Sequence, residues 1–129
     1  MSSKIILVVD DDNDYLFQVS YYLQQGGYKV LSASSEKEAL QILEKEKPDL
    51  AILDLMMENE DSGFRLSRRL KRMYPNVPII IATAVASETG INFGLNTEGD
   101  HEWIKADAYL EKGIRPDQMM AEVQKLLNK

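Results

Sequence analysis

Three short runs of apolar residues constrain the fold of this chain more than any other feature of its 129 residues. They span residues 5–9, 50–53 and 79–82, and no polar residue interrupts any of them. A strand in which every residue is apolar is buried on both faces, as the strands of a parallel sheet are. We therefore expect strands at these places, with two weaker strands at residues 28–33 and 108–110.

Segments with the spacing of amphipathic helices separate the expected strands. Gly26 and Gly27 end the first, Ser35 and Glu38 form a capping-box pattern in the second, and Pro116 opens the last. The residues expected to face the core are Leu16, Val19, Tyr22 and Leu23, then Ala39, Leu40 and Leu43, then Leu66, Leu70 and Met73, and finally Met119 or Met120, Val123, Leu126 and Leu127. This alternation predicts an α/β fold, a doubly wound, flavodoxin-like parallel sheet of five strands in the order 2-1-3-4-5 with helices on both faces.

The composition bounds the class of protein. A chain of this length with 44% apolar residues builds one folded domain, which we place at residues 4–129, with no output domain. The absence of cysteine and of a signal-peptide segment predicts a cytoplasmic protein. No apolar run is long enough for membrane insertion. The net charge of −6 argues against a nucleic-acid partner.

Polar side chains of one chemical theme follow four of the five expected strands. They are Asp10, Asp11, Asp12 and Asp14 after the first strand, Asp54 after the third, Thr83 after the fourth and Lys112 after the fifth. Ligands of open parallel sheets bind at the carboxyl ends of the strands, and the order 2-1-3-4-5 places Asp10 and Asp11 beside Asp54. Carboxylates packed together repel one another unless a cation lies among them, and Mg²⁺ prefers oxygen ligands of this kind.

The chemistry of these groups fits phosphoryl transfer. A carboxylate oxygen of Asp54 can attack phosphorus and form an aspartyl phosphate. The transferring group needs its charge stabilised, and Mg²⁺, the Lys112 ammonium and the Thr83 hydroxyl can each do part of this. A plainer interpretation is that Asp12 or Asn13 caps the following helix, which explains one or two of the acids but not all four.

The order and spacing of these motifs resemble the receiver domain of two-component response regulators. The blocks that carry the resemblance are residues 8–11 (VVDD), 53–57 (LDLMM), Gly63, residues 81–84 (IATA) and residues 107–112 (DAYLEK). The resemblance covers the chain from about residue 4 to its end. It implies that the protein is not a conventional enzyme but catalyses its own phosphorylation and dephosphorylation.

The resemblance also implies a role for each matching residue. Asp54 is the phosphoacceptor, and Thr83 and Lys112 contact the phosphoryl group. Asp10, Asp11, Asp54 and the backbone carbonyl of Met56 hold Mg²⁺, and Thr83 and Tyr109 form the switch. The implied partners are a sensor histidine kinase or phosphotransfer protein, which donates from a phosphohistidine, and a downstream protein target.

The chain departs from the pattern of that family at three places. Gly113 follows the lysine where the family has a proline in a cis peptide, so we expect a trans bond here. Glu58 replaces another proline. The segment from Thr83 to Lys112 is longer than usual, and we expect an irregular loop with a short helix near residues 100–105. Within it, His101 is expected at the surface and Trp103 in local packing.

Two alternatives stay open. The start of the acidic segment also resembles the opening motif of haloacid-dehalogenase-type phosphatases, in which Asp10 would be the nucleophile and Asp12 the general acid. The second alternative is a degenerate receiver that acts only as a binding module. The aspartate that becomes labelled by acetyl phosphate with Mg²⁺, or the absence of any label, distinguishes the three.

Overall fold

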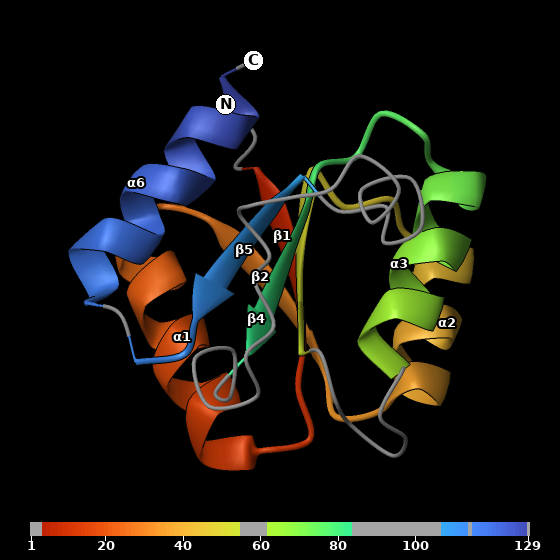
Figure 1. The fold of residues 1–129 in the computed structure, drawn as a ribbon, viewed down its shortest axis with the longest axis horizontal. Coiled ribbons are helices and arrows are strands. Elements are labelled where there is room, and N and C mark those ends of the chain that lie inside the picture. Colours follow the sequence, from red (N-terminus) through yellow and green to blue (C-terminus); the bar gives the residue numbers. More distant parts are fainter. Residues whose placement is uncertain (1–3, 55–61, 84–106, 114, 129) are drawn as a thin grey trace, which may run out of the picture.

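The computed structural model describes residues 4–54, 62–83, 107–113 and 115–128 (Figure 1). Five strands and four helices lie in this part of the chain. In chain order they are β1 (Ile5–Val9), α1 (Asn13–Gln25), β2 (Lys29–Ala33), α2 (Glu36–Lys45), β3 (Leu50–Asp54), α3 (Ser62–Met73), β4 (Ile79–Thr83), β5 (Ala108–Glu111) and α6 (Pro116–Leu127). The predicted strands and helices of this part are therefore present, with small shifts at their ends.

All five strands are parallel and lie in the order β2-β1-β3-β4-β5, which confirms the predicted topology. Helices α1 and α6 cover one face of the sheet, and α2 and α3 cover the other (Figure 1). The central strands β1 and β3 are buried between these layers. Because the strands are parallel, all their carboxyl ends lie at the same edge of the sheet.

Successive residues of a strand point to opposite faces of the sheet, and each face packs into its own hydrophobic core. Toward α1 and α6 the strands contribute Ile6, Val8, Leu50, Ile52, Ile80 and Ala82, which pack with Leu16, Val19, Leu23, Met119, Val123 and Leu126. Toward α2 and α3 they contribute Leu7, Val9, Ala33, Ala51, Leu53, Ile79 and Ile81, which pack with Ala39, Leu43, Leu66, Leu70 and Val77. The prediction that Tyr22 and Met73 face the core is wrong, because each residue is 38% exposed. Tyr22 instead packs edge-on against its neighbour Tyr21, and Met73 is the last residue of α3.

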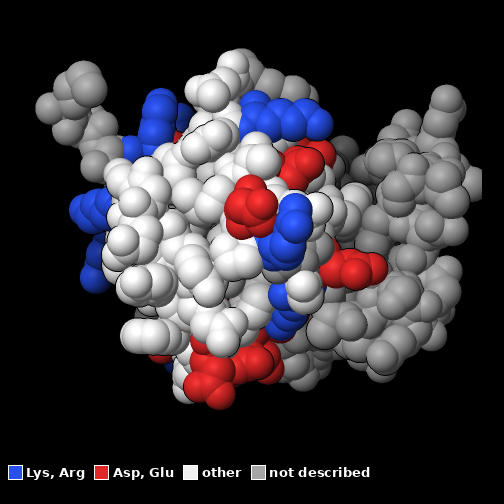
Figure 2. Space-filling view, turned by 90° about the vertical axis from the view of Figure 1, so that its left-hand side faces the viewer, with Lys and Arg blue, Asp and Glu red and all other residues white. Residues whose placement is uncertain are grey.

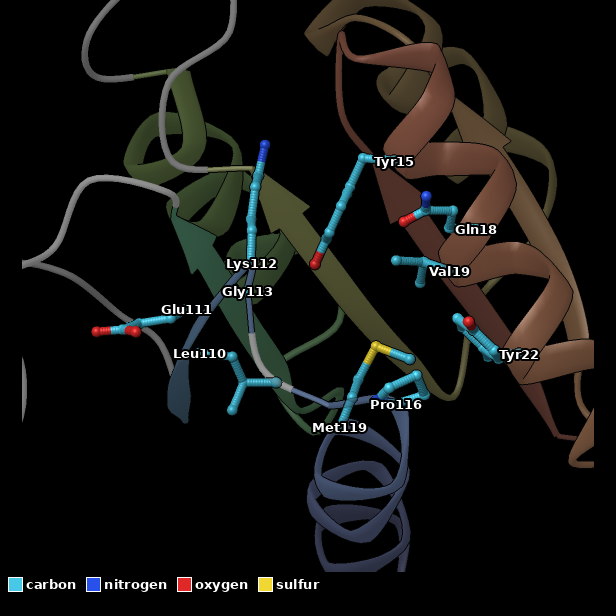
Figure 3. A pocket seen from close by; sticks show the side chains of 10 residues that line it. All are labelled: Tyr15, Gln18, Val19, Tyr22, Leu110, Glu111, Lys112, Gly113, Pro116 and Met119. Carbon is cyan, nitrogen blue, oxygen red and sulfur yellow. The ribbon is translucent and has the colours of Figure 1, made fainter.

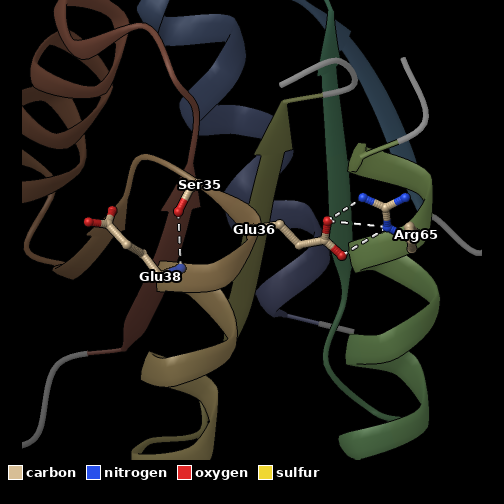
Figure 4. Close-up of polar contacts among 4 residues, drawn as sticks. All are labelled: Ser35, Glu36, Glu38 and Arg65. Carbon is tan, nitrogen blue, oxygen red and sulfur yellow. Dashed lines mark hydrogen bonds and ion pairs between the residues drawn. The ribbon is translucent and has the colours of Figure 1, made fainter. Parts of the chain in front are cut away.

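Side-chain caps begin α1 and α2. The Asp12 carboxylate accepts hydrogen bonds from the N–H groups of Asp14 and Tyr15 at 3.0 and 3.3 Å, so Asp12 is the cap of α1. Ser35 Oγ accepts from Glu38 N–H at 3.1 Å (Figure 4), as the capping-box pattern predicts. In a capping box the glutamate also accepts from the N–H of the cap residue, which is Ser35 here. The Glu38 carboxylate instead accepts from the N–H of Ser34, one residue earlier.

The two helical layers differ in charge. Helices α2 and α3 are joined by an ion pair in which the Arg65 guanidinium donates to both carboxylate oxygens of Glu36, the shortest contact being 2.6 Å (Figure 4). By contrast, α1 carries a single charged residue, Asp14, and it exposes Phe17 by 74% and Tyr21 by 51%. Figure 2 shows the face that includes α1 and α6, with a broad area free of charged side chains.

No helix among the described residues is long and apolar enough to span a bilayer.

Candidate functional site

Three charged residues from different strands meet at the carboxyl edge of the sheet. Asp10 follows β1, Asp54 is the last residue of β3, and Lys112 directly follows β5. The Lys112 ammonium lies 2.7 Å from Asp10 Oδ2 and 3.1 Å from Asp54 Oδ1. In the order β1-β3-β4-β5, the lysine spans the end of β4 to reach Asp54 and the ends of β4 and β3 to reach Asp10. The topology thus brings together three of the residues that the sequence predicts at this site.

Asp11 completes an acidic cluster beside Lys112. Asp10, Asp11 and Asp54 each offer a carboxylate oxygen, and these oxygens all lie within 4.8 Å of one another. Asp10 Oδ1 accepts from the Asp12 N–H at 2.9 Å. Asp10 Oδ2 is buried and accepts no aligned hydrogen bond from the described residues, so its contact there is the ion pair with Lys112. An oxygen-only donor set with one under-satisfied buried oxygen fits a hard divalent cation such as Mg²⁺.

Burial sets the electrostatics of the cluster. Burial and the negative charge of Asp10 raise the pKa of Asp54 to about 6, although Lys112 pulls it back in part. Burial alone would lower the pKa of Lys112, but its contacts with Asp10 and Asp54 outweigh burial and raise it. Lys112 therefore stays charged, and one cation faces three carboxylates. This excess of negative charge favours a second cation at the site.

Tyr15 lies against the cluster, and the sequence analysis missed it. The Lys112 ammonium lies 4.8 Å from the centroid of the Tyr15 ring. Burial raises the pKa of Tyr15 to about 12; Lys112 lowers this value, and the charges of Asp10 and Asp54 raise it. Tyr15 lies in the first turn of α1, where side chains point back toward the start of the helix. Its position three residues after the helix cap is the one sequence signal that could have placed it near the acids.

Several residues singled out in the sequence, one of them a predicted metal ligand, lie outside the described part of the structure. Met56, Glu58, His101, Trp103 and the expected loop and short helix of the long segment belong to this group. Thr83 ends β4 opposite Glu111, but its side chain is also outside the described part. These predictions stay untested.

Two other residues singled out in the sequence are described. Tyr109 pairs with Ile81 across β4 and β5, and it packs partly buried against the core on the α2 and α3 side. Gly113 is exposed, and a Cβ built there would meet nothing within 4 Å. No cis peptide bond occurs among the described residues, which agrees with the trans bond expected at Gly113.

Comparison with known proteins identifies the family. The family model for the response regulator receiver domain matches residues 6–124. The chain belongs to the response regulator receiver domain family. The resemblance seen in the sequence is therefore confirmed, and the haloacid-dehalogenase alternative gains no support. The carboxylate of Asp12, which that alternative needs as a general acid, is engaged in capping α1.

Curated relatives of this receiver include longer proteins. It is 35% identical over 127 residues to the alkaline phosphatase synthesis transcriptional regulatory protein PhoP of Bacillus subtilis, covering 98% of this chain and 50% of that protein. It is 33% identical over 131 residues to the phosphate regulon transcriptional regulatory protein PhoB of Pseudomonas aeruginosa, covering 100% of this chain and 54% of that protein. The receiver thus spans about half the length of these relatives. Because both are named as transcriptional regulators, the expectation that nucleic acid is not a partner gains no support.

One solved structure with the same fold is a complex with a ligand. The response regulator protein TrrA of Thermotoga maritima, in complex with Mg(2+)-BeF, is 29% identical to this receiver. The two superpose with a TM-score of 0.78 over 95% of this chain and 98% of that one. The receiver fold found here is therefore shared nearly end to end with that protein.

Proposed function

We propose that this receiver domain accepts a phosphoryl group on Asp54 from the phosphohistidine of a sensor kinase or phosphotransfer protein. The observation that carries the proposal is the meeting of Asp10, Asp11 and Asp54 with Lys112 at the carboxyl edge of the sheet. Crowded carboxylates with one cation are poorly arranged for stability alone, and they are well arranged to bind a metal ion and a phosphoryl group.

The transfer replaces one bond to phosphorus by another. As an Asp54 oxygen forms a bond to phosphorus, the phosphorus–nitrogen bond of the phosphohistidine breaks, and the imidazole nitrogen keeps the electron pair and takes up a proton from water. Asp54 must be ionised to attack, which a pKa of about 6 allows at neutral pH. Lys112 exchanges its contact with Asp54 for one with a phosphoryl oxygen, while its ion pair with Asp10 persists.

Asp10, Asp11 and Asp54 would hold Mg²⁺, with the Met56 carbonyl as the further ligand that the family implies. When bound, this ion neutralises charge on the phosphoryl oxygens during transfer. The donor set of this receiver supports the proposal, as does the complex of its relative TrrA with Mg(2+)-BeF.

We also propose that phosphorylation switches a surface that a downstream protein target binds, through Thr83 and Tyr109. Thr83 ends the strand next to Asp54, and Tyr109 pairs with that same strand at Ile81. Phosphorylation shifts the population toward a conformer with these two residues repacked only as far as the phosphoryl group stabilises that conformer over the other. A full reversal of a 1:99 population needs roughly 5.5 kcal/mol.

Labelling with acetyl phosphate tests the proposal. With Mg²⁺ present, the wild type should incorporate base-labile phosphate on Asp54 and release acetate, and Asp54→Asn should incorporate none. Asp49→Asn, at the opposite edge of the sheet, is the control and should be labelled normally. Label on Asp10 together with hydrolysis of phosphate esters would establish the phosphatase alternative. A folded wild type that takes no label would establish the degenerate receiver.

A further inference from the structure

Two kinds of neighbour surround the ammonium group of Lys112. Asp10 and Asp54 contact it at 2.7 and 3.1 Å, and the ring of Tyr15 lies with its centroid 4.8 Å away. A cation at this distance from an aromatic ring is attracted by the ring quadrupole, more strongly where both groups are removed from water. Tyr15 and Lys112 are both partly buried, so this contact is not a weak surface pairing.

A cavity of about 240 Å³ opens beside these two side chains. It lies between α1, the end of β5 and the start of α6, and Tyr15, Tyr22, Lys112, Gly113 and Met119 are among the residues that line it (Figure 3). Gly113 lines the cavity without a side chain to fill it, and a Cβ built there would meet none of the described residues within 4 Å, its chain neighbours aside. A lysine stem has many rotamers, so the cavity offers Lys112 positions away from the carboxylates.

We propose that Tyr15 is a positioning residue for phosphoryl transfer, whose ring keeps the Lys112 ammonium between Asp10 and Asp54 and out of the cavity. This inference rests on the proposed function of Asp54. Held in this way, the ammonium has only a short distance to move from the Asp54 carboxylate to an incoming phosphoryl oxygen. A charge that is already in place stabilises the transition state without reorganisation, which raises the rate of transfer.

Two substitutions separate the ring of Tyr15 from its hydroxyl. Tyr15→Phe keeps the ring face, and Tyr15→Leu removes it while leaving an apolar side chain. We expect Tyr15→Leu to slow labelling by acetyl phosphate and Mg²⁺ about threefold to tenfold, the range that one cation–π contact supplies. Tyr15→Phe should stay within about twofold of the wild type. Tyr22→Leu is the matched control, because Tyr22 lines the same cavity but its ring packs on Tyr21, and it should leave the rate unchanged.

A second measurement needs neither metal nor phosphate. In NMR spectra of the metal-free protein, the Hε protons of Lys112 should be shifted upfield by the ring current in the wild type and in Tyr15→Phe. The ammonium protons of Lys112 should exchange slowly with water in both. In Tyr15→Leu the upfield shift should disappear, and the ammonium signal should broaden because the lysine samples the cavity.

The outcomes separate this inference from the proposed function. Wild-type labelling together with slow ammonium exchange in Tyr15→Leu would overturn the positioning role, as would a Tyr15→Phe variant as slow as Tyr15→Leu. If Asp54→Asn were labelled like the wild type, the proposed function would fail, and the NMR comparison would still decide whether the ring holds Lys112. Should Tyr15→Leu fail to fold, Tyr15→Met provides the variant without a ring.

Discussion

The two edges of the sheet use the same side chain in opposite ways. At the amino-terminal edge, Asp49 precedes β3 and Asp107 precedes β5. Each carboxylate accepts a hydrogen bond from the first residue of the neighbouring strand, from Ile5 N–H at 2.7 Å and from Ile79 N–H at 2.8 Å. Each aspartate also donates its own N–H to the carbonyl of that residue. Both aspartates therefore extend the strand pairing beyond its last regular hydrogen bond.

At the carboxyl edge, Asp10 and Asp54 face each other and share one cation, Lys112. Here the carboxylates do not tie strands together, and their mutual repulsion raises the pKa of Asp54 to about 6 in addition to the effect of burial. The difference teaches that a strand-end aspartate is interpretable only with its neighbours. A carboxylate that accepts from the N–H of a neighbouring strand is typical of a structural aspartate, whereas crowding of carboxylates is typical of a site that a ligand completes.

The largest effect should come from removing the cation at each edge. Lys112→Met leaves two buried carboxylates without their ion pair, and we expect the metal-free protein to lose about 3 kcal/mol of unfolding free energy at pH 7.5. Lys71→Met, at the other edge, removes an ion pair of 2.9 Å to Asp107 that is partly exposed, and it should cost about 1 kcal/mol or less. Urea unfolding in EDTA measures both changes.

Magnesium should sharpen this contrast. Millimolar Mg²⁺ should recover part of the stability of Lys112→Met, because the ion supplies the charge that the lysine provided, by linkage of binding to folding. The same addition should leave the loss in Lys71→Met unchanged. Equal losses in the two variants, or no response of Lys112→Met to Mg²⁺, would contradict the proposed difference between the edges.

A second test removes a carboxylate from the structural edge. Asp107 accepts from Ile79 N–H and from the Lys71 ammonium, at 2.8 and 2.9 Å. Asp107→Ala leaves that N–H without its acceptor, and we expect a loss of about 1–3 kcal/mol in urea unfolding. Asp107→Asn keeps an acceptor oxygen and should lose less than half as much. If Asp107→Ala unfolded at the same urea concentration as the wild type, this carboxylate would not hold β5 to β4.

Much of the fold and part of the site could be predicted from the sequence, for physical reasons. Fully apolar runs such as residues 50–53 predict buried parallel strands, and parallel strands place Asp10 beside Asp54 without further information. Tyr15 could not be found in this way, because its role depends on how a helix side chain meets a lysine from a distant strand. Tyr22 was misplaced because an amphipathic pattern does not tell a tyrosine at the edge of the apolar stripe from one within it.

A smaller effect should appear in the pH dependence of stability. Because the pKa of Asp54 is raised to about 6, the folded state binds a proton that the unfolded state releases near pH 4. The neutral carboxyl therefore adds stability that is fully present below pH 4 and is lost as the pH rises through 6. Asp54→Asn cannot titrate, so in EDTA the wild type should lose stability relative to this variant between pH 4 and 7. Parallel stability curves for the two proteins would show that folding does not raise the pKa of Asp54.

The smallest effect should come from Asp49→Asn, which tests whether the amino-terminal edge needs a charge at all. The Asp49 carboxylate accepts from Ile5 N–H, and no ion pair to it is found among the described residues. An asparagine oxygen can accept the same bond, so we expect a loss of no more than about 0.5 kcal/mol in urea unfolding. Asp49→Ala should lose about 1–2 kcal/mol, because Ile5 N–H then has no acceptor. If Asp49→Asn were as damaging as Asp49→Ala, charge rather than geometry would matter at this edge, and the two edges would differ only in degree.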